Sequence, residues 1–165
     1  MERLWSPWRL AYVSGGESNG CVFCDAQANE QAATLVVFGG VTCFVILNLY
    51  PYNNGHLMVV PRRHFASLAD ATPEELAELM RLTRGAEMAL TEVYHPQGLN
   101  VGMNLGRAAG AGVADHMHVH VVPRWAGDTN FMSVLGDVRV LPEALEETAS
   151  RLRPVFGKIL AAAQD

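Results

Sequence analysis

The sequence predicts an α+β fold, with an antiparallel sheet of about five strands, one long helix packed on the sheet and a C-terminal helix. Three observations lead to this expectation. Short apolar or alternating segments, separated by turn-forming residues, lie within 34–61 and 100–123. A long amphipathic segment extends from Thr72 to about Tyr94. A last helical segment covers Pro142 to about Ala163, and we expect a proline within it to kink or divide that helix.

Size and composition indicate one domain. The chain has 165 residues, of which 50% are hydrophobic, enough for a proper core. We expect an N-terminal arm over 1–20, a core over 21–125 and a helical extension over 126–165. The sequence has no apolar run long enough for a membrane span and begins without the apolar core of a signal peptide, so a cytoplasmic protein is expected. The net charge of −5 argues against a general nucleic-acid binder.

The N-terminal arm is rich in aromatic residues. Its two tryptophans, with a tyrosine and an arginine, fall within Leu4–Tyr12. Two interpretations stay open: the arm packs on the body or on a second subunit, or Trp8 or Arg9 reaches a substrate.

Cys21 and Cys24 form a CxxC pair that fits either redox chemistry or a metal site. The third cysteine makes the count odd, which argues against a disulfide framework. This residue, Cys43, lies in an apolar run and is expected in the core.

A β-hairpin and a third strand are expected in the first half of the chain. Residues 34–38 and 41–49 are apolar-rich and flank Gly39-Gly40, a tight turn. The stretch 48–55 is rich in Asn, Pro, Tyr and Gly and predicts a loop. His56 through Pro61 predicts the third strand.

The long helix has a clear start signal. Thr72 is a good N-cap, Pro73 suits the first turn, and Glu75 completes a capping box. His95-Pro96-Gln97-Gly98 is expected to end the helix. We expect its apolar residues to pack on the sheet: Leu76, Leu79, Met80, Met88, Leu90 and Val93.

A glycine-rich loop follows the next expected strand, Asn100 to Gly106. This loop, 107–112, consists of Arg107 and five small residues, and it leads into a stretch that alternates histidine with apolar residues. Glycines let backbone N–H groups approach an anion closely, although a plain hairpin turn remains the alternative.

The alternating stretch places three histidines at period two. His116, His118 and His120 alternate with Met117, Val119 and Val121. On a strand, such residues share one face and span about 13 Å. Imidazole can act as a nucleophile, a proton carrier or a metal ligand. We therefore expect a functional row of imidazoles on this strand.

His-x-His-x-His followed by two hydrophobic residues resembles the signature of the histidine triad superfamily. The N-terminal arm and the stretch from Val121 through Phe131 resemble its branch of bacterial diadenosine tetraphosphate phosphorylases. The resemblance covers essentially the whole chain. It implies a histidine triad fold and nucleotidyl transfer at an α-phosphate. Members are commonly homodimers.

The resemblance assigns roles to particular residues. His118, the middle histidine, would attack the α-phosphorus, while His120 and His56 would donate hydrogen bonds to phosphoryl oxygens. Asn48 matches a ribose-binding position eight residues before His56, although it could simply cap its turn. Asn104 matches a residue that, with the amides of Gly110 to Gly112, holds the scissile phosphate. The usual glutamine of that loop is absent here, and the loop is one residue longer.

The resemblance also implies a structural zinc site. Cys21, Cys24, His64 and His116 fit a Cys₂His₂ set residue by residue. Alternatively, His64 is an exposed loop residue and the thiols are free.

The substrate implied is an adenosine polyphosphate. Phosphorolysis of diadenosine tetraphosphate would need a cation for the phosphate acceptor, for which Arg9, Arg107 and Arg124 are candidates, and Trp125 is a further substrate-binding candidate. Hydrolysis that releases AMP, and a nucleotide-binding module with little turnover, remain the alternatives.

Overall fold

The computed structural model describes residues 20–28, 32–128 and 142–162. The expected N-terminal arm, with Trp8 and Arg9, lies outside the described residues. Within the described ranges, five antiparallel strands form one sheet, as predicted, and their order is β1-β2-β3-β5-β4. The strands are β1 (Val36–Gly39), β2 (Cys43–Leu47), β3 (Leu57–Pro61), β4 (Gly98–Gly102) and β5 (Val119–Arg124).

Both faces of the central strands are covered, which explains their uninterrupted apolar sequences. Every residue of β2 and β3 is buried. Val45, Leu47, Leu57 and Val59 belong to the larger core, beneath the long helix. Their neighbours along the strands, such as Phe44 and Met58, form a second cluster on the opposite face. Alternate side chains of a strand point to opposite faces, so each strand supplies both clusters.

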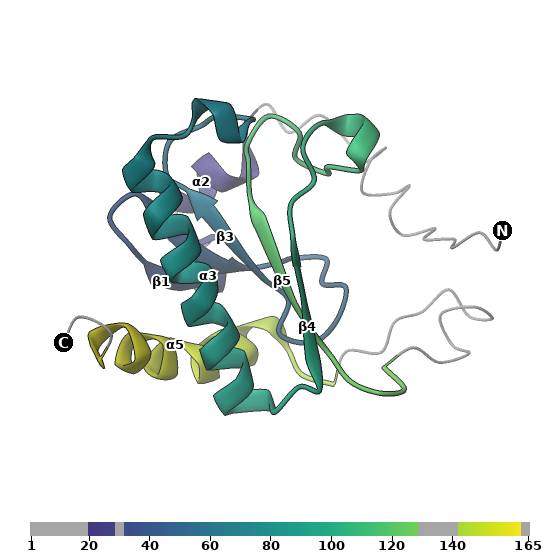
Figure 1. Ribbon diagram of the computed structural model, residues 1–165. Helices are drawn as coiled ribbons and strands as arrows, with labels where there is room; N and C mark the ends of the chain where they lie inside the picture. The colour runs from purple at the N-terminus through teal and green to yellow at the C-terminus, as the bar shows by residue number, and fades with distance from the viewer. Residues whose placement is uncertain (1–19, 29–31, 129–141, 163–165) are drawn as a thin grey trace, which may run out of the picture.

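The long helix α3 (Pro73–Tyr94) covers one face of the sheet (Figure 1). The predicted capping box is present: Glu75 N–H donates to Thr72 Oγ1 at 3.2 Å, and Thr72 N–H donates to Glu75 Oε2 at 2.8 Å. The predicted apolar stripe is partly wrong, since Leu76, Met80 and Met88 are exposed. The buried stripe keeps two predicted leucines and adds Leu82 and two alanines: Leu79, Leu82, Ala86, Ala89 and Leu90.

Glu78 ties α3 to the β1–β2 turn. Its carboxylate accepts hydrogen bonds from the N–H groups of Val41, Thr42 and Cys43, and from the Thr42 hydroxyl at 2.7 Å. Burial alone would raise the pKa of Glu78, but these hydrogen bonds outweigh it and lower the pKa to about 2. A side chain at Gly40 would lie 2.8 Å from both Cys43 O and Glu78 Oε1, so this turn requires glycine.

The C-terminal helix α5 (Leu145–Ala162) packs on α3 and β1. Pro154 lies inside this helix, which continues past it as one element, so of the two expected effects, a kink or a division, the division does not occur. None of the described helices has the length and apolarity to cross a membrane.

A short helix, α2 (Val22–Ala28), starts immediately after Cys21 and lies on the sheet face opposite α3 (Figure 1). Its Phe23 and Ala26 pack against the second apolar cluster. Three 3-10 turns complete the described structure: η1 (Ala32–Leu35), η2 (Leu68–Asp70) and η3 (Arg107–Ala109). The expected strand from residue 34 therefore begins only at Val36.

Candidate active site

The three alternating histidines do not share one strand, which corrects the sequence prediction. Strand β5 begins at Val119, so only His120 lies in the sheet. Pairing with β3 ends at Val59↔Val119, and the Met117 N–H instead donates to Phe65 O at 2.7 Å. The nearby end of β3 is Pro61, which has no N–H to extend the ladder. The chain bends at His116, yet Met117, Val119 and Val121 all enter the larger core, so the alternation of side chains is kept. The His116 ring contacts Phe23, as the His118 ring does.

His118 is held in a single tautomer. Its Nδ1 lies 2.9 Å from the carbonyl oxygen of His116 and therefore carries the proton that it donates. Nε2 then carries the lone pair. The ring is 4% exposed, and this burial lowers the pKa of His118, although the hydrogen bond to the carbonyl opposes the shift. A neutral imidazole with Nε2 unprotonated is the form that a nucleophile requires.

A chain of hydrogen bonds also sets the tautomer of His120. The Tyr52 N–H donates to His56 Nδ1 at 3.0 Å, so the proton of His56 is on Nε2. His56 Nε2 lies 3.0 Å from His120 Nδ1 and donates to it, which leaves the proton of neutral His120 on Nε2. His56 is fully buried. Both nitrogens of His56 are therefore engaged with protein groups, Nδ1 with the Tyr52 N–H and Nε2 with His120 Nδ1.

Two adjoining cavities meet at these histidines. Tyr52 and His120 border both cavities, while His118 borders only the smaller one. The smaller cavity, of about 130 Å³, is mainly apolar and includes Phe23 and Asn48. The larger cavity, of about 320 Å³, lies along β4 and β5 and is lined mainly by polar groups, among them Asn53, Asn100, Asn104, Arg124 and Asp128.

The structure brings Asn48 and Asn104 to the site. Asn48 borders the smaller cavity beside His118, and its Oδ1 also accepts the Tyr50 N–H at 2.9 Å. Both interpretations of Asn48, as a turn residue and as a cavity residue, are thus compatible with its position. Asn104 borders the larger cavity next to His120.

The glycine-rich loop is not an open anion nest. The Gly110 N–H donates to Arg107 O at 2.9 Å, and the Ala111 N–H donates to Gly106 O at 3.3 Å. These amides close the 3-10 turn η3 and are not directed at a ligand. Gly112 does border the smaller cavity. Of the three residues expected to bind phosphate through their amides, 110–112, only Gly112 therefore remains a candidate.

The candidate cations differ from expectation. Arg124 borders the larger cavity, but its guanidinium is paired with the Asp128 carboxylate at 2.6 and 2.9 Å and donates to Asn100 Oδ1 at 2.9 Å. Its charge is thus largely balanced. Arg107 is exposed on η3 and borders neither cavity, and Trp125 also lies outside both linings.

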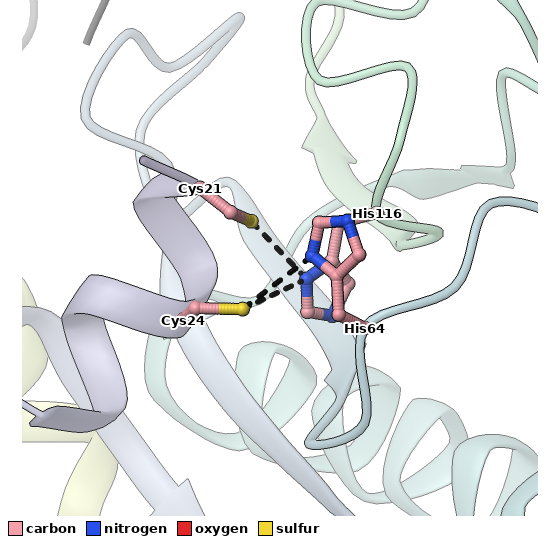
Figure 2. A group of neighbouring side chains, drawn as sticks. All are labelled: Cys21, Cys24, His64 and His116. Atoms are coloured by element: carbon pink, nitrogen blue, oxygen red, sulfur yellow. Dashed lines mark hydrogen bonds between the residues drawn. The ribbon is translucent and has the colours of Figure 1, made fainter. Parts of the chain in front are cut away.

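The Cys₂His₂ set does come together. The ligand atoms of Cys21, Cys24, His64 and His116 all lie within 4.8 Å of one another (Figure 2). His116 Nδ1 is 3.2 Å from Cys21 Sγ and 3.7 Å from Cys24 Sγ, and His64 Nδ1 is 3.5 Å from Cys24 Sγ. A tetrahedral zinc ion separates such ligand atoms by about 3.3–3.8 Å. These four residues could hold a metal.

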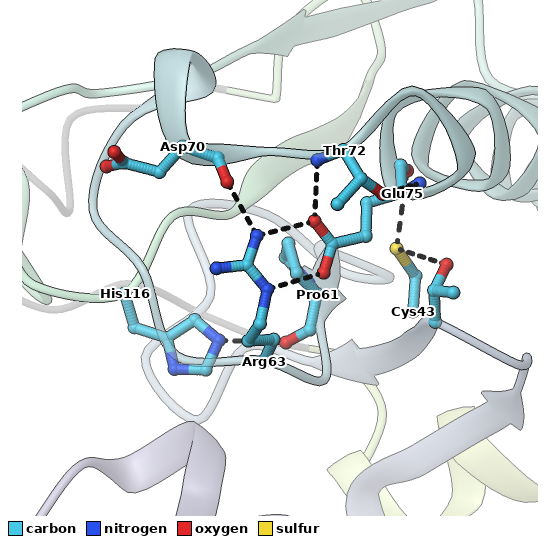
Figure 3. Close-up of polar contacts among 8 residues, drawn as sticks. Cys43, Pro61, Arg63, Asp70, Thr72, Glu75 and His116 are labelled. Atoms are coloured by element: carbon cyan, nitrogen blue, oxygen red, sulfur yellow. Dashed lines mark hydrogen bonds and ion pairs between the residues drawn. The ribbon is translucent and has the colours of Figure 1, made fainter.

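Neighbouring contacts orient this cluster. His116 Nε2 donates to Pro61 O at 2.8 Å, so its Nδ1 presents a lone pair to the cysteines. Arg63, beside His64, forms a two-pronged ion pair with Glu75 of α3 at 2.8 and 3.0 Å and donates to Asp70 O at 2.6 Å (Figure 3). The hydrogen bonds from Arg63, only partly opposed by burial, lower the pKa of Glu75.

Sequence reasoning missed two residues that shape the site. Phe23, inside the CxxC turn, contacts the His118 ring with centroids 4.9 Å apart. Tyr52 places its ring 4.7 Å from His56 and 5.8 Å from His120. Phe23 could have been identified by its place between two metal-ligand candidates, and Tyr52 by its place in the loop that leads to His56.

Comparisons with known proteins agree with this geometry. The HIT domain family model matches residues 29–127. The AP-4-A phosphorylase of Mycobacterium tuberculosis is 43% identical over 90% of this chain and 80% of that protein. The asymmetrical bis(5'-nucleosyl)-tetraphosphatase of Schizosaccharomyces pombe is 37% identical over 50% of this chain and 44% of that protein.

A solved structure has a similar fold over most of the chain. A Zn-bound histidine triad family protein from Mycobacterium smegmatis has a TM-score of 0.71 and 31% identity, covering 88% of this chain and 99% of that chain.

Proposed function

The chain belongs to the HIT domain family and is an enzyme, and on this premise we propose that it transfers a nucleotidyl group from an adenosine polyphosphate through His118. The preferred reaction is phosphorolysis of diadenosine tetraphosphate to ADP and ATP. One observation carries the proposal: His118 borders a cavity and its Nδ1 is held by a carbonyl, which leaves the lone pair on Nε2 available for attack.

Two displacements make up the proposed reaction. His118 Nε2 attacks the α-phosphorus, the bond to the bridging oxygen breaks, and ATP leaves. An oxygen of inorganic phosphate then attacks the adenylyl-histidine, the P–N bond breaks, and ADP forms. His120 would donate from Nε2 to a phosphoryl oxygen, where negative charge develops, while His56 fixes that tautomer from behind.

The two cavities suit two parts of such a substrate. We assign the adenosine next to the attacked phosphorus to the smaller cavity, where Asn48 can bind ribose hydroxyls through its amide. The polyphosphate that leaves, and the phosphate that replaces it, would enter from the larger cavity past Asn104. The amide side chains and the balanced Arg124–Asp128 pair supply hydrogen bonds there without strong net charge.

We propose that zinc occupies the Cys₂His₂ cluster. The donor set and the separations of its atoms support a closed structural site that joins α2, the end of β3 and the segment before β5. A bound ion would supply no open coordination position, so we assign no step of the reaction to it. We also keep the expectation of a cytoplasmic homodimer, for which β4, at the sheet edge with Val101 exposed, is a candidate contact.

Product analysis tests the reaction. Purified protein is incubated with diadenosine tetraphosphate, with and without inorganic phosphate, and the nucleotides are separated. ADP and ATP that appear only with phosphate would support phosphorolysis. AMP with ATP would indicate hydrolysis, which the similarity to the tetraphosphatase keeps as the alternative. Tight binding without turnover would indicate a binding module.

A pair of variants tests the nucleophile. His118→Ala should lower the rate more than about a hundredfold, since the attacking group is lost. His95→Asn is the matched control, because His95 ends α3 in the left-handed conformation, which asparagine tolerates, and lines neither cavity. Near-wild-type activity of His118→Ala would remove the mechanism.

A further inference from the structure

The CxxC turn serves two sites at once. Its outer residues, Cys21 and Cys24, face the metal-ligand cluster. Its inner residues, Val22 and Phe23, border the smaller cavity together with His118. The same four-residue segment therefore supplies half of the metal ligands and part of the wall proposed to hold adenosine. A shift of the backbone that carries the two thiols would also shift this wall.

A second connection runs through the backbone of His116. The side chain of His116 faces Cys21 through Nδ1 and is fixed to Pro61 O through Nε2. Its carbonyl oxygen accepts the hydrogen bond that sets the tautomer of His118. One residue thus belongs to the metal cluster through its ring and holds the nucleophile through its main chain.

The Phe23 ring connects these two paths. It is buried, with its centroid 5.4 Å from the His116 ring and 4.9 Å from the His118 ring. Its helix, α2, has only seven residues, and a helix of that length is not stable by itself. Packing of Phe23 and Ala26 on the second apolar cluster holds one face of α2, and the metal ligands Cys21 and Cys24 are well placed to fix its start.

We infer that metal occupancy of the Cys₂His₂ cluster and nucleotide binding in the smaller cavity are coupled, with Phe23 and His116 as positioning residues. The inference rests on the proposed function, since it assumes that a nucleotide binds there. Coupling between two sites is reciprocal: the factor by which the metal tightens nucleotide binding equals the factor by which the nucleotide tightens metal binding. We expect a factor of about ten, within the usual range for coupled sites.

Metal release from the zinc-loaded protein provides the first test. Zinc transfer to an excess of a chromogenic chelator is followed with and without AMP, a probe that fills the adenosine site without turnover. AMP should slow release several-fold. Circular dichroism is recorded in parallel and should remain constant while zinc leaves. If zinc is lost only together with the helical signal, the ion stabilises the whole fold and has no specific link to the cavity, and the inference is overturned.

Nucleotide affinity provides the reciprocal test. Calorimetry with AMP should give a dissociation constant about tenfold lower for the zinc-loaded protein than for the chelated protein. Equal affinities would overturn the coupling and leave the proposed reaction standing. Failure of AMP to bind the zinc-loaded protein would instead refute the proposed function. A protein that binds no zinc would remove the zinc proposal and the present inference and leave the proposed reaction standing.

A matched pair of phenylalanine variants tests whether the coupling between the two sites depends on Phe23. Phe23→Leu keeps an apolar side chain on α2 but removes the ring that contacts both histidines. Phe38→Leu makes the same change where the ring stacks on Phe156, among the residues of the larger core. Both variants should bind one zinc ion per chain. The effect of AMP on zinc release should fall at least threefold in Phe23→Leu and remain unchanged in Phe38→Leu. An unchanged effect in Phe23→Leu would overturn the role of Phe23.

Discussion

Removal of His56 is predicted to impair catalysis only through His120. The His56 Nε2–H bond to His120 Nδ1, at 3.0 Å, is a neutral hydrogen bond worth about 0.5–1.5 kcal/mol. His56→Leu should therefore lower kcat up to about tenfold, because His120 can then adopt the other tautomer. His120→Ala removes the donor itself and should cost about 10²–10³ in kcat. His56→Gln retains an N–H near the position of Nε2 and should stay within about threefold of wild type.

A double variant distinguishes an orienting role of His56 from an independent catalytic role. If His56 acts only by orienting His120, then His56→Leu/His120→Ala should be no slower than His120→Ala alone. The assay is steady-state turnover of diadenosine tetraphosphate, with thermal unfolding by circular dichroism as the control, since His56 is fully buried. Losses that multiply in the double variant would refute the orientation mechanism and return His56 to a separate role.

Three further predictions concern stability and metal binding. The lowered pKa of Glu78 stabilises the fold at pH values above the unfolded value of 4.5, and this stability is lost as the pH falls towards about 2. Glu78→Gln should therefore lower the free energy of unfolding in urea by about 2–3 kcal/mol at pH 7 and match wild type near pH 2. A difference from wild type that is the same at pH 7 and pH 2 would contradict this. Cys24→Ala should lose the bound zinc measured by elemental analysis, whereas Cys43→Ala, outside the cluster, should retain it. Gly40→Ala should destabilise the protein by about 1–3 kcal/mol in urea unfolding, because the added methyl group would lie 2.8 Å from two oxygens. Gly98→Ala is the control, since its added methyl group has no atom within 4 Å and should cause no clash.

The sheet and the long helix were predictable because their signals are local. Turn residues separated the apolar strands, and the capping box at Thr72 fixed the start of α3. The buried face of α3 was less accessible to prediction. Apolar side chains at Met80 and Met88 favoured a wider stripe, but both are exposed, and the buried face includes Ala86 and Ala89, whose small side chains gave no strong apolar signal.

The histidine stretch shows what an alternating pattern leaves out. Period-two spacing predicts a strand, and it cannot reveal that the ladder to β3 ends near Pro61. The metal-ligand cluster joins segments far apart in the chain, so family resemblance, and not spacing alone, brought His64 and Cys21 together. The pairing of Arg124 with Asp128 likewise depends on a turn whose closure is visible only in the fold.

The most direct test of the account is identification of the covalent intermediate. Zinc-loaded protein is mixed with diadenosine tetraphosphate without phosphate, quenched in alkali to preserve the P–N bond, digested and analysed by peptide mass spectrometry. We predict one adenylyl group on His118 that disappears, with formation of ADP, when phosphate is added before the quench. An adenylyl group on another residue, or turnover with no adduct at any time, would contradict the central role of His118.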